Sequence, residues 1–291
     1  MGYEYNGARQ NYYAFIAAVK GRFGRHGFLT ASYTRSDSKD NSANYPEGYV
    51  ATGGTNYDIN QWYSPSTWDV PNRVSLGWSY DIPGITREGG FVRRLTTGFN
   101  MGATTVLQSG TPFFVYNPNP LALVDTAGVT VNAANYQSEL AAGHIGFAPN
   151  SGNYSADGDN NPSGVGDVPD VVSYHQKHDR KSYQYTGVVD AGIITHAQFA
   201  QPAFKAGGTE GNEKLGQFRN PGYADTDLSV KKVTNITERL NFELRLDMFN
   251  LFNRVNLNGV NNNFGDASAG FGTTSSNMPP RNMQVGARIT F

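Results

Sequence analysis

Long stretches of this sequence alternate strictly between apolar and polar residues, and this alternation limits the folds that the chain can adopt. The last eleven residues, RNMQVGARITF (281–291), alternate apolar Met283 and Val285 with polar Gln284 and Arg288. Successive side chains of a β-strand point to opposite faces, so this stretch predicts a strand with one apolar and one polar face. A soluble sheet would bury the apolar face against a protein core, whereas a membrane barrel would present it to lipid.

The same period of two recurs along the chain and predicts an all-β fold with long strands. The expected strands lie near residues 11–23, 28–36, 72–82, 95–109, 224–234, 239–252 and 281–291. Several reach about 10 residues, the length of a tilted membrane strand (about 9–11), whereas soluble strands usually have about 5 to 6. The 34 Gly, 17 Tyr and 17 Phe residues suit strands and turns. No run approaches the roughly 18 apolar residues of a membrane helix.

The polar faces of these strands carry full charges. The charged residues are Arg73, Asp81, Asp225, Asp227, Lys231, Glu243, Arg245, Asp247 and Arg288. A packed interior would have to pair each of them, and the sequence shows no long amphipathic helix that could cover the apolar faces instead. A barrel with lipid outside and water inside meets both requirements. The charges are therefore expected to face the lumen, where they either line a permeation path or keep the interior hydrated and hold a plug.

Short and long connections alternate between the strands. The long ones are expected at 37–70, 110–222 and 253–280, and the longest of them should hold irregular structure with short strands or a helical turn, packed over or into the barrel mouth. Outer-membrane barrels have short periplasmic turns and long extracellular loops, so the last strand would end at the periplasmic face. There Phe291, in phase with the apolar face, would be the terminal aromatic that the barrel assembly machinery reads.

Aromatic residues near strand ends predict girdles at the two membrane interfaces. They are Tyr13, Tyr33, Tyr80, Tyr223, Phe249 and Phe252.

Composition and motifs exclude several classes of function. The net charge of −1 gives no electrostatic support for binding nucleic acid, and the lack of cysteine excludes disulfides, thiolate metal sites and a Cys nucleophile. Phosphate-loop, nucleophile-elbow and zincin patterns are absent, so we expect no enzyme activity and no cofactor.

Two segments have weak metal-site patterns. In YHQKHDRK, His175, His178 and Asp179 fit either a transition-metal site or a solvated polar loop. Asp157, Asp159 and Asn161 match the first ligand positions of a calcium loop, but Pro162 stands where that loop needs Gly and no Glu follows at its twelfth position. A flexible loop rich in turn formers is the alternative.

A series of motifs resembles the C-terminal end of TonB-dependent outer-membrane receptors, and most closely the Oar-like group, which carries a carboxypeptidase-regulatory-like domain. The motifs, in chain order, are YYAFIAAVKGRFGRHGFLTASYTRSDSKDNS, WDVPNRVSLGWSYDIP, GATTVLQSGTPFFV, LGQFRNPGYADTDLSVKK, DMFNLFNRVNL and the final RNMQVGARITF. Each motif alone is moderately specific, and their shared order over nearly the whole chain makes the resemblance strong.

The resemblance implies a barrel of about 22 strands, of which this chain would supply seven to eight. No plug, TonB box or signal peptide can be located in the sequence, so we expect the C-terminal piece of a longer protein. The implied partners are outer-membrane lipid, the TonB complex through a region outside this chain, the assembly machinery and an unknown ligand.

Three functions remain open from the sequence. The first is energy-coupled uptake of a scarce ligand, such as a siderophore, an oligosaccharide or a peptide, across the outer membrane. The second is an Oar-like surface or adhesion role without transport. The third is a soluble secreted β-sandwich that binds a ligand.

Overall fold

The computed structural model describes residues 9–41, 63–84, 90–115, 123–124, 130–131, 138, 142, 169–200, 212–214, 216–264, 268–274 and 276–291. The long strands are β1 (Gln10–Phe23), β2 (Gly27–Asp40), β4 (Asn72–Ile82), β5 (Phe99–Gln108), β12 (Tyr223–Asn235), β13 (Asn241–Phe249) and β14 (Asn282–Thr290). The short strands are β3 (Ser64–Pro65), β6 (Pro112–Phe113), β7 (Leu123–Val124), β8 (Thr130–Val131), β9 (Asp170–Val171), β10 (Phe199–Ala200) and β11 (Phe218–Arg219). The helices are α1 (Phe91–Thr96) and the 3-10 helix η2 (His196–Gln198).

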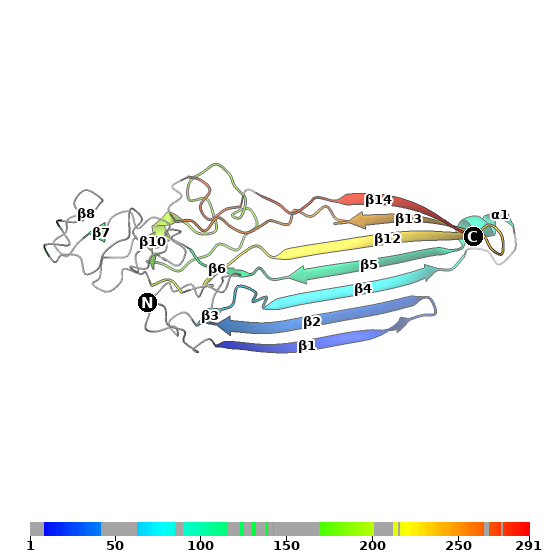
Figure 1. The fold of residues 1–291 in the computed structure, drawn as a ribbon, viewed down its shortest axis with the longest axis horizontal. Helices are drawn as coiled ribbons and strands as arrows, with labels where there is room; N and C mark the ends of the chain where they lie inside the picture. The colour runs from blue at the N-terminus through cyan, green and yellow to red at the C-terminus, as the bar shows by residue number, and fades with distance from the viewer. Residues whose placement is uncertain are drawn as a thin grey trace.

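The long strands form one antiparallel sheet, in the order β1-β2-β4-β5-β12-β13-β14, with β3 paired to β2. Figure 1 shows them side by side, with the described parts of the long connections at one end and the described parts of the short ones at the other. We call these the loop end and the turn end. The all-β antiparallel prediction is confirmed. Among the described residues, no helix is long and apolar enough to cross a membrane.

Three boundaries differ from the sequence prediction. β2 continues to Asp40, into the segment expected to be a loop from residue 37. Residues 91–96 form α1, so β5 begins at Phe99 and not near residue 95. β13 ends at Phe249, three residues before the expected end, where Asn250 adopts a positive φ of 51°.

The strand register places the apolar residues of the sheet on one face. A row of directly paired residues crosses the whole sheet on this face: Gly21, Leu29, Trp78, Ala103, Leu228, Met248 and Met283. The neighbouring row lies on the opposite face and is mostly polar: Arg22, Phe28, Ser79, Gly102, Ser229, Asp247 and Gln284. We call the two sides of the sheet the apolar face and the polar face. A slip of one residue would swap the two faces of a strand. All six strand pairings keep the apolar residues on the same side, so they agree on one register.

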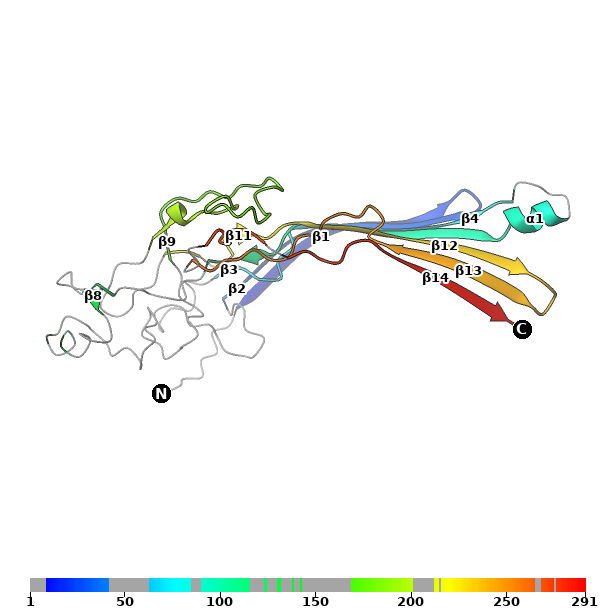
Figure 2. The ribbon, with the colours of Figure 1, turned by 90° about the horizontal axis from the view of Figure 1, so that it is seen from above.

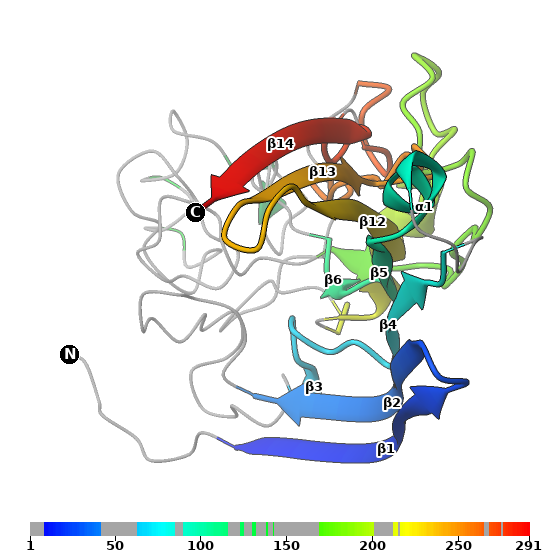
Figure 3. The same cartoon turned by 90° about the vertical axis from the view of Figure 1, so that its right-hand side faces the viewer.

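The sheet curves around its polar face. Figure 3, which looks along the strands, shows it as an arc, and Figure 2 shows β12, β13 and β14 bending away from the plane of β4 at the turn end. A cavity of about 510 Å³ lies against polar-face residues such as Ser79, Thr104 and Asp247, which identifies this side as the concave one. The apolar face is therefore convex.

The hydrophobic core does not lie beneath the sheet. On the apolar face, Val285 is 70% exposed and Ile289 is 60% exposed, and the buried apolar residues of the long strands are Ala103 and Ala224. The core instead lies at the loop end. Its buried members are Phe113, Val115, Tyr183, Ile193, Ile194, Phe199, Phe218, Leu257, Val260 and Phe271.

Segments far apart in the sequence build this core. β6 pairs with β11, so Phe113 lies opposite Phe218, and β9 pairs with β10, so Val171 lies opposite Phe199. The side-chain amide of Asn262 donates to the carbonyl oxygen of Phe114 at 2.7 Å. We call the described segments 110–115, 169–200, 212–222 and 254–278 the cap. In its described parts, the loop predicted at 110–222 has the expected short strands and helical turn.

Candidate functional site

The register brings all of the predicted lumen-facing charges onto the polar face. They come from four strands: Arg73 and Asp81 from β4, Asp225, Asp227 and Lys231 from β12, Glu243, Arg245 and Asp247 from β13, and Arg288 from β14. Their position follows from the period of two, because each lies an even number of residues from the others on its strand. The concave side of the sheet is thus its charged side.

Several of these charges have partners across or along the strands. Arg245 Nε donates to Asp247 Oδ1 at 2.8 Å, and Glu243 lies directly opposite Arg288 in the pairing of β13 with β14. The amide of Asn100 donates to Asp81 Oδ1 at 2.7 Å. Lys231, in contrast, lies directly opposite Arg245, and like charges in this position repel. The carboxylate of Asp247, which accepts a hydrogen bond from Arg245, offsets part of this repulsion.

The cavity of about 510 Å³ lies where β4, β5, β12 and β13 pass side by side. Its lining includes the charged residues Asp227, Arg245 and Asp247 and the aromatic residues Phe28 and Phe249. Charges, hydroxyls and aromatic rings can together contact a polar ligand or another part of the protein.

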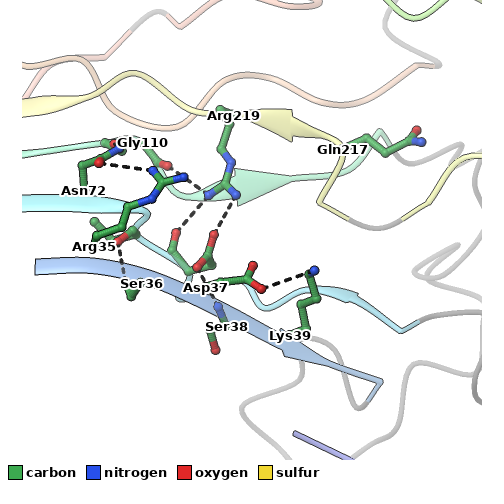
Figure 4. Close-up of polar contacts among 12 residues, drawn as sticks. Arg35, Ser36, Asp37, Ser38, Lys39, Asn72, Gly110, Gln217 and Arg219 are labelled. Carbon is green, nitrogen blue, oxygen red and sulfur yellow. Dashed lines mark hydrogen bonds and ion pairs between the residues drawn. The ribbon is translucent and has the colours of Figure 1, made fainter. Parts of the chain in front are cut away.

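At the loop end, a buried ion pair fixes the cap to the rim of the sheet. Arg219 Nη2 lies 2.6 Å from Asp69 Oδ2, and the Asp69 side chain is only 1% exposed. The Arg219 side chain also donates to the main-chain carbonyls of Asp69 and Gly110. Asp69 Oδ1 accepts the backbone N–H of Ser38 in β2 at 2.9 Å. Figure 4 shows Arg219 reaching from β11 toward Gly110 and the end of β2 that carries Ser38.

Glu213 is a buried acid in the cap. Its Oε1 accepts the backbone N–H of Val115 at 2.7 Å, whereas its buried Oε2 has no hydrogen-bond partner among the described residues. Burial raises the pKa of the Glu213 carboxyl well above its ordinary value, against the smaller opposing effect of the Val115 hydrogen bond.

The two metal-site hypotheses receive no support from the described residues. His175, His178 and Asp179 are exposed, and the described part of the chain holds no cluster of three or more potential metal ligands. Asp179 instead accepts the hydroxyl and the backbone N–H of Ser182, and these hydrogen bonds lower the pKa of its carboxyl. The calcium candidates Asp157, Asp159 and Asn161 lie outside the described residues.

The aromatic-girdle prediction is wrong for two of its residues. The register places Tyr223 opposite Gln108 and Phe249 opposite Asn282, on the polar face, where neither ring can meet lipid. The Tyr223 hydroxyl donates to Asp225 at 3.0 Å. On the apolar face near the turn end, Phe23 and Tyr80 stack with their ring centroids 6.0 Å apart, and Phe23 was not predicted for a girdle.

β1 differs from the other long strands because its polar-face side also carries large apolar residues. On its polar-face side it carries Tyr12 and Ile16, which are 60% and 63% exposed. The sequence contains this signal as consecutive apolar residues at 12–19, which weakens the alternation there.

A family model for the outer membrane beta barrel domain matches residues 1–284. The chain belongs to this family. It is therefore an outer-membrane β-barrel protein, and the family together with the single-layered curved sheet gives no support to the soluble sandwich considered above.

Among solved structures, P. aeruginosa FpvA in complex with a heterologous pyoverdine and iron is similar, with a TM-score of 0.40 and 12% sequence identity. The similarity covers 97% of this chain and 19% of that chain, so the present chain corresponds to about a fifth of FpvA. At this TM-score the similarity carries no functional conclusion. No curated protein matches the chain.

Proposed function

We propose that this chain forms part of the wall of a TonB-dependent outer-membrane transporter of the Oar-like group, which takes up a scarce ligand by energy coupling. The observation that carries the proposal is the continuous polar, concave face, which holds charged residues on four strands. A channel or a lumen that holds a plug needs such a hydrated wall. The ordered motifs described above support the choice of family group.

The open edges of the sheet agree with a larger barrel. Among the described strands, β1 and β14 each have one neighbour in the sheet, so each leaves one row of backbone N–H and C=O groups without a described strand partner. In lipid such groups must be paired, so further strands would complete the wall. A closed wall of about 22 strands would enclose a wide lumen. We infer no catalytic role for the charged residues, which would hydrate the lumen and contact its contents.

The experiment is an uptake assay in the native host. Radiolabelled ferric siderophores, oligosaccharides and peptides are offered to cells with and without the gene, in the presence and absence of a protonophore. Transport predicts that one ligand class accumulates in the periplasm only with the gene and an energised membrane. Accumulation that the protonophore does not affect would contradict energy coupling.

A surface or adhesion role is the second candidate, and the exposed side of the cap favours it. Val172, Tyr174 and Val188 are each at least 60% exposed although they lie beside a well-packed core. Exposed aromatic and aliphatic groups on a folded platform suit contact with another macromolecule. In the uptake assay, this role predicts no accumulation of any ligand. A separate attachment assay should show that the gene deletion reduces the binding of cells to a surface.

A further inference from the structure

The helix α1, between β4 and β5 at the turn end, leaves its apolar side uncovered. Phe91, Val92 and Leu95 are 74%, 60% and 51% exposed, and α1 has no buried residue. At 100° per residue these three side chains share one side of the helix, whereas Arg93 and Arg94 lie on the other. Such a short helix is unstable alone in water, so its amphipathic pattern requires a surface on which it rests.

Lys232 joins α1 to the apolar face of the sheet. It lies on the apolar face because it pairs with Phe99 and Leu244, and its Nζ donates to the carbonyl oxygens of Arg94, Leu95 and Thr97 at 2.9 to 3.0 Å. The same ammonium group lies 4.3 Å from the centre of the Phe99 ring. A cation on a lipid-facing strand is costly unless its charge is satisfied, and here the last carbonyls of α1 satisfy it.

α1 therefore extends the lipid-facing surface of the barrel. Figure 3 shows it on the outer side of the arc, at the turn end of β5. The apolar side of α1 and the apolar face of the sheet meet at Lys232, so both border the same bilayer. The turn end is the periplasmic side if the short connections follow the usual pattern, and that side faces the phospholipid leaflet.

Beside α1 is a cavity of about 500 Å³ with a basic lining. Arg93, Arg94, Thr97 and Asn235 contribute polar groups to it, and none of the described residues that line it is acidic. Arginine presents a fork of N–H donors that fits phosphate oxygens. The size and the basic lining of this cavity suit the phosphate of a lipid whose acyl chains lie against Phe91, Val92 and Leu95.

We propose that α1 is an interfacial anchor that binds an anionic phospholipid of the periplasmic leaflet. Phe91, Val92 and Leu95 enter the acyl-chain boundary, and Arg93 and Arg94 hold the headgroup phosphate. This arrangement requires only the outer-membrane location and does not depend on whether the protein transports a ligand.

The first test measures the depth of α1 in a bilayer. The sequence has no cysteine, so a single Val92→Cys substitution gives one labelling site for an environment-sensitive fluorophore. The control is Glu238→Cys on the β12–β13 turn, an exposed position at the same end. The intact protein is reconstituted into vesicles of phosphatidylethanolamine and phosphatidylglycerol, and heat-modifiable migration confirms that each variant is folded. If Val92→Cys does not fold, Leu95→Cys replaces it.

We expect the label at position 92 to be quenched by lipids that carry a nitroxide high on the acyl chain and to be protected from aqueous iodide. The label at position 238 should show the reverse. Equal access of iodide to both labels would overturn the proposal, since α1 would then stand in water.

The second test addresses the headgroup. Energy transfer from the label at position 92 to fluorescent phosphatidylglycerol or phosphatidylcholine measures which lipid is enriched around α1. An Arg near an anionic membrane surface contributes about fivefold in affinity, so Arg93→Gln with Arg94→Gln should abolish most of the preference for phosphatidylglycerol, and Arg93→Lys with Arg94→Lys should retain much of it. An unchanged preference in the glutamine variant would contradict a role for these arginines.

Discussion

Glu213 shows how one buried carboxyl links the stability of the cap to pH. Below its ordinary pKa of 4.5, the group is protonated in both the closed and the opened cap. Above that value the opened cap releases the proton while the closed cap keeps it, because burial raises the pKa of Glu213. The free energy of opening should therefore fall as the pH rises above 4.5, by at most about 1.4 kcal/mol per pH unit, until the raised pKa is passed.

Hydrogen exchange at the Val115 amide, which donates to Glu213, checks this prediction. After correction for intrinsic exchange, protection should decrease from pH 5 to pH 8 in the unmodified protein and stay nearly constant in Glu213→Gln. Asp179→Asn, at an exposed position in the cap, serves as the control and should keep the pH dependence. An equal slope in Glu213→Gln would assign the effect to another group.

Asp69 should be the residue on which the attachment of the cap to the sheet depends most. Asp69→Ala leaves Arg219 without its carboxylate and the Ser38 N–H without its acceptor. Removing one partner of a buried ion pair costs about 3 kcal/mol or more. Hydrogen exchange at the Ser38 amide would measure this loss. The nearby Asp37–Lys39 pair is exposed on both sides, so Asp37→Ala should cost less than about 1 kcal/mol. Equal losses in the two variants would show that the Asp69–Arg219 pair stabilises the cap no more than the exposed Asp37–Lys39 pair does.

At the level of elements, the junction between α1 and β5 depends on Gly98. Its φ is +78°, and a Cβ there would lie only 2.1 Å from the carbonyl oxygen of Val233 in β12. Its own carbonyl accepts the N–H of Val233 at 2.8 Å. Gly98→Ala should therefore cost about 1–3 kcal/mol and loosen β5 from β12 at the turn end.

The denaturant midpoint of heat-modifiable migration reports this loss. Gly286→Ala is the matched control, since nothing lies within 4 Å of a Cβ at that position. If both variants keep the midpoint of the unmodified protein, the close approach of β5 and β12 at Gly98 does not contribute to stability.

The sequence predicts a strand well when the alternation of apolar and polar residues runs along the whole length of the strand. The strand at 72–82 matches β4 because one face is apolar and the other polar from end to end. The outer part of β2 was missed because Asp37 and Lys39 occupy the positions where the apolar alternation would continue, so both faces there are polar. α1 was missed because six residues are too few to show a helical period.

The same reasoning applies to the sites. The charges of the polar face were predictable, since a period of two fixes their side of the sheet. The core of the cap was not, because Phe113, Phe218 and Phe271 meet from segments that no local pattern connects. Tyr223 and Phe249 were assigned to girdles from their position at strand ends alone, without the phase that decides which face they occupy.

For the whole molecule, the convex apolar face of the single-layered sheet needs a covering. The apolar row that runs from Leu29 to Met283 crosses six strands, and no described segment forms a second layer over it. Burial of apolar surface drives folding at about 25 cal/mol per Å², so a soluble protein could not leave this face in water. Acyl chains are the covering that the family assignment supplies.

Spin labels at neighbouring positions of β14 test this directly. In the reconstituted protein, a label at Val285→Cys should be accessible to oxygen and shielded from a water-soluble nickel reagent, while a label at Gln284→Cys should show the opposite. Because the strands share one register, Leu244→Cys and Arg245→Cys on β13 should repeat the contrast. A slip of one residue in β14 would invert the β14 pair alone, whereas inversion of both pairs would mean that the charged face, and not the apolar face, is the covered one.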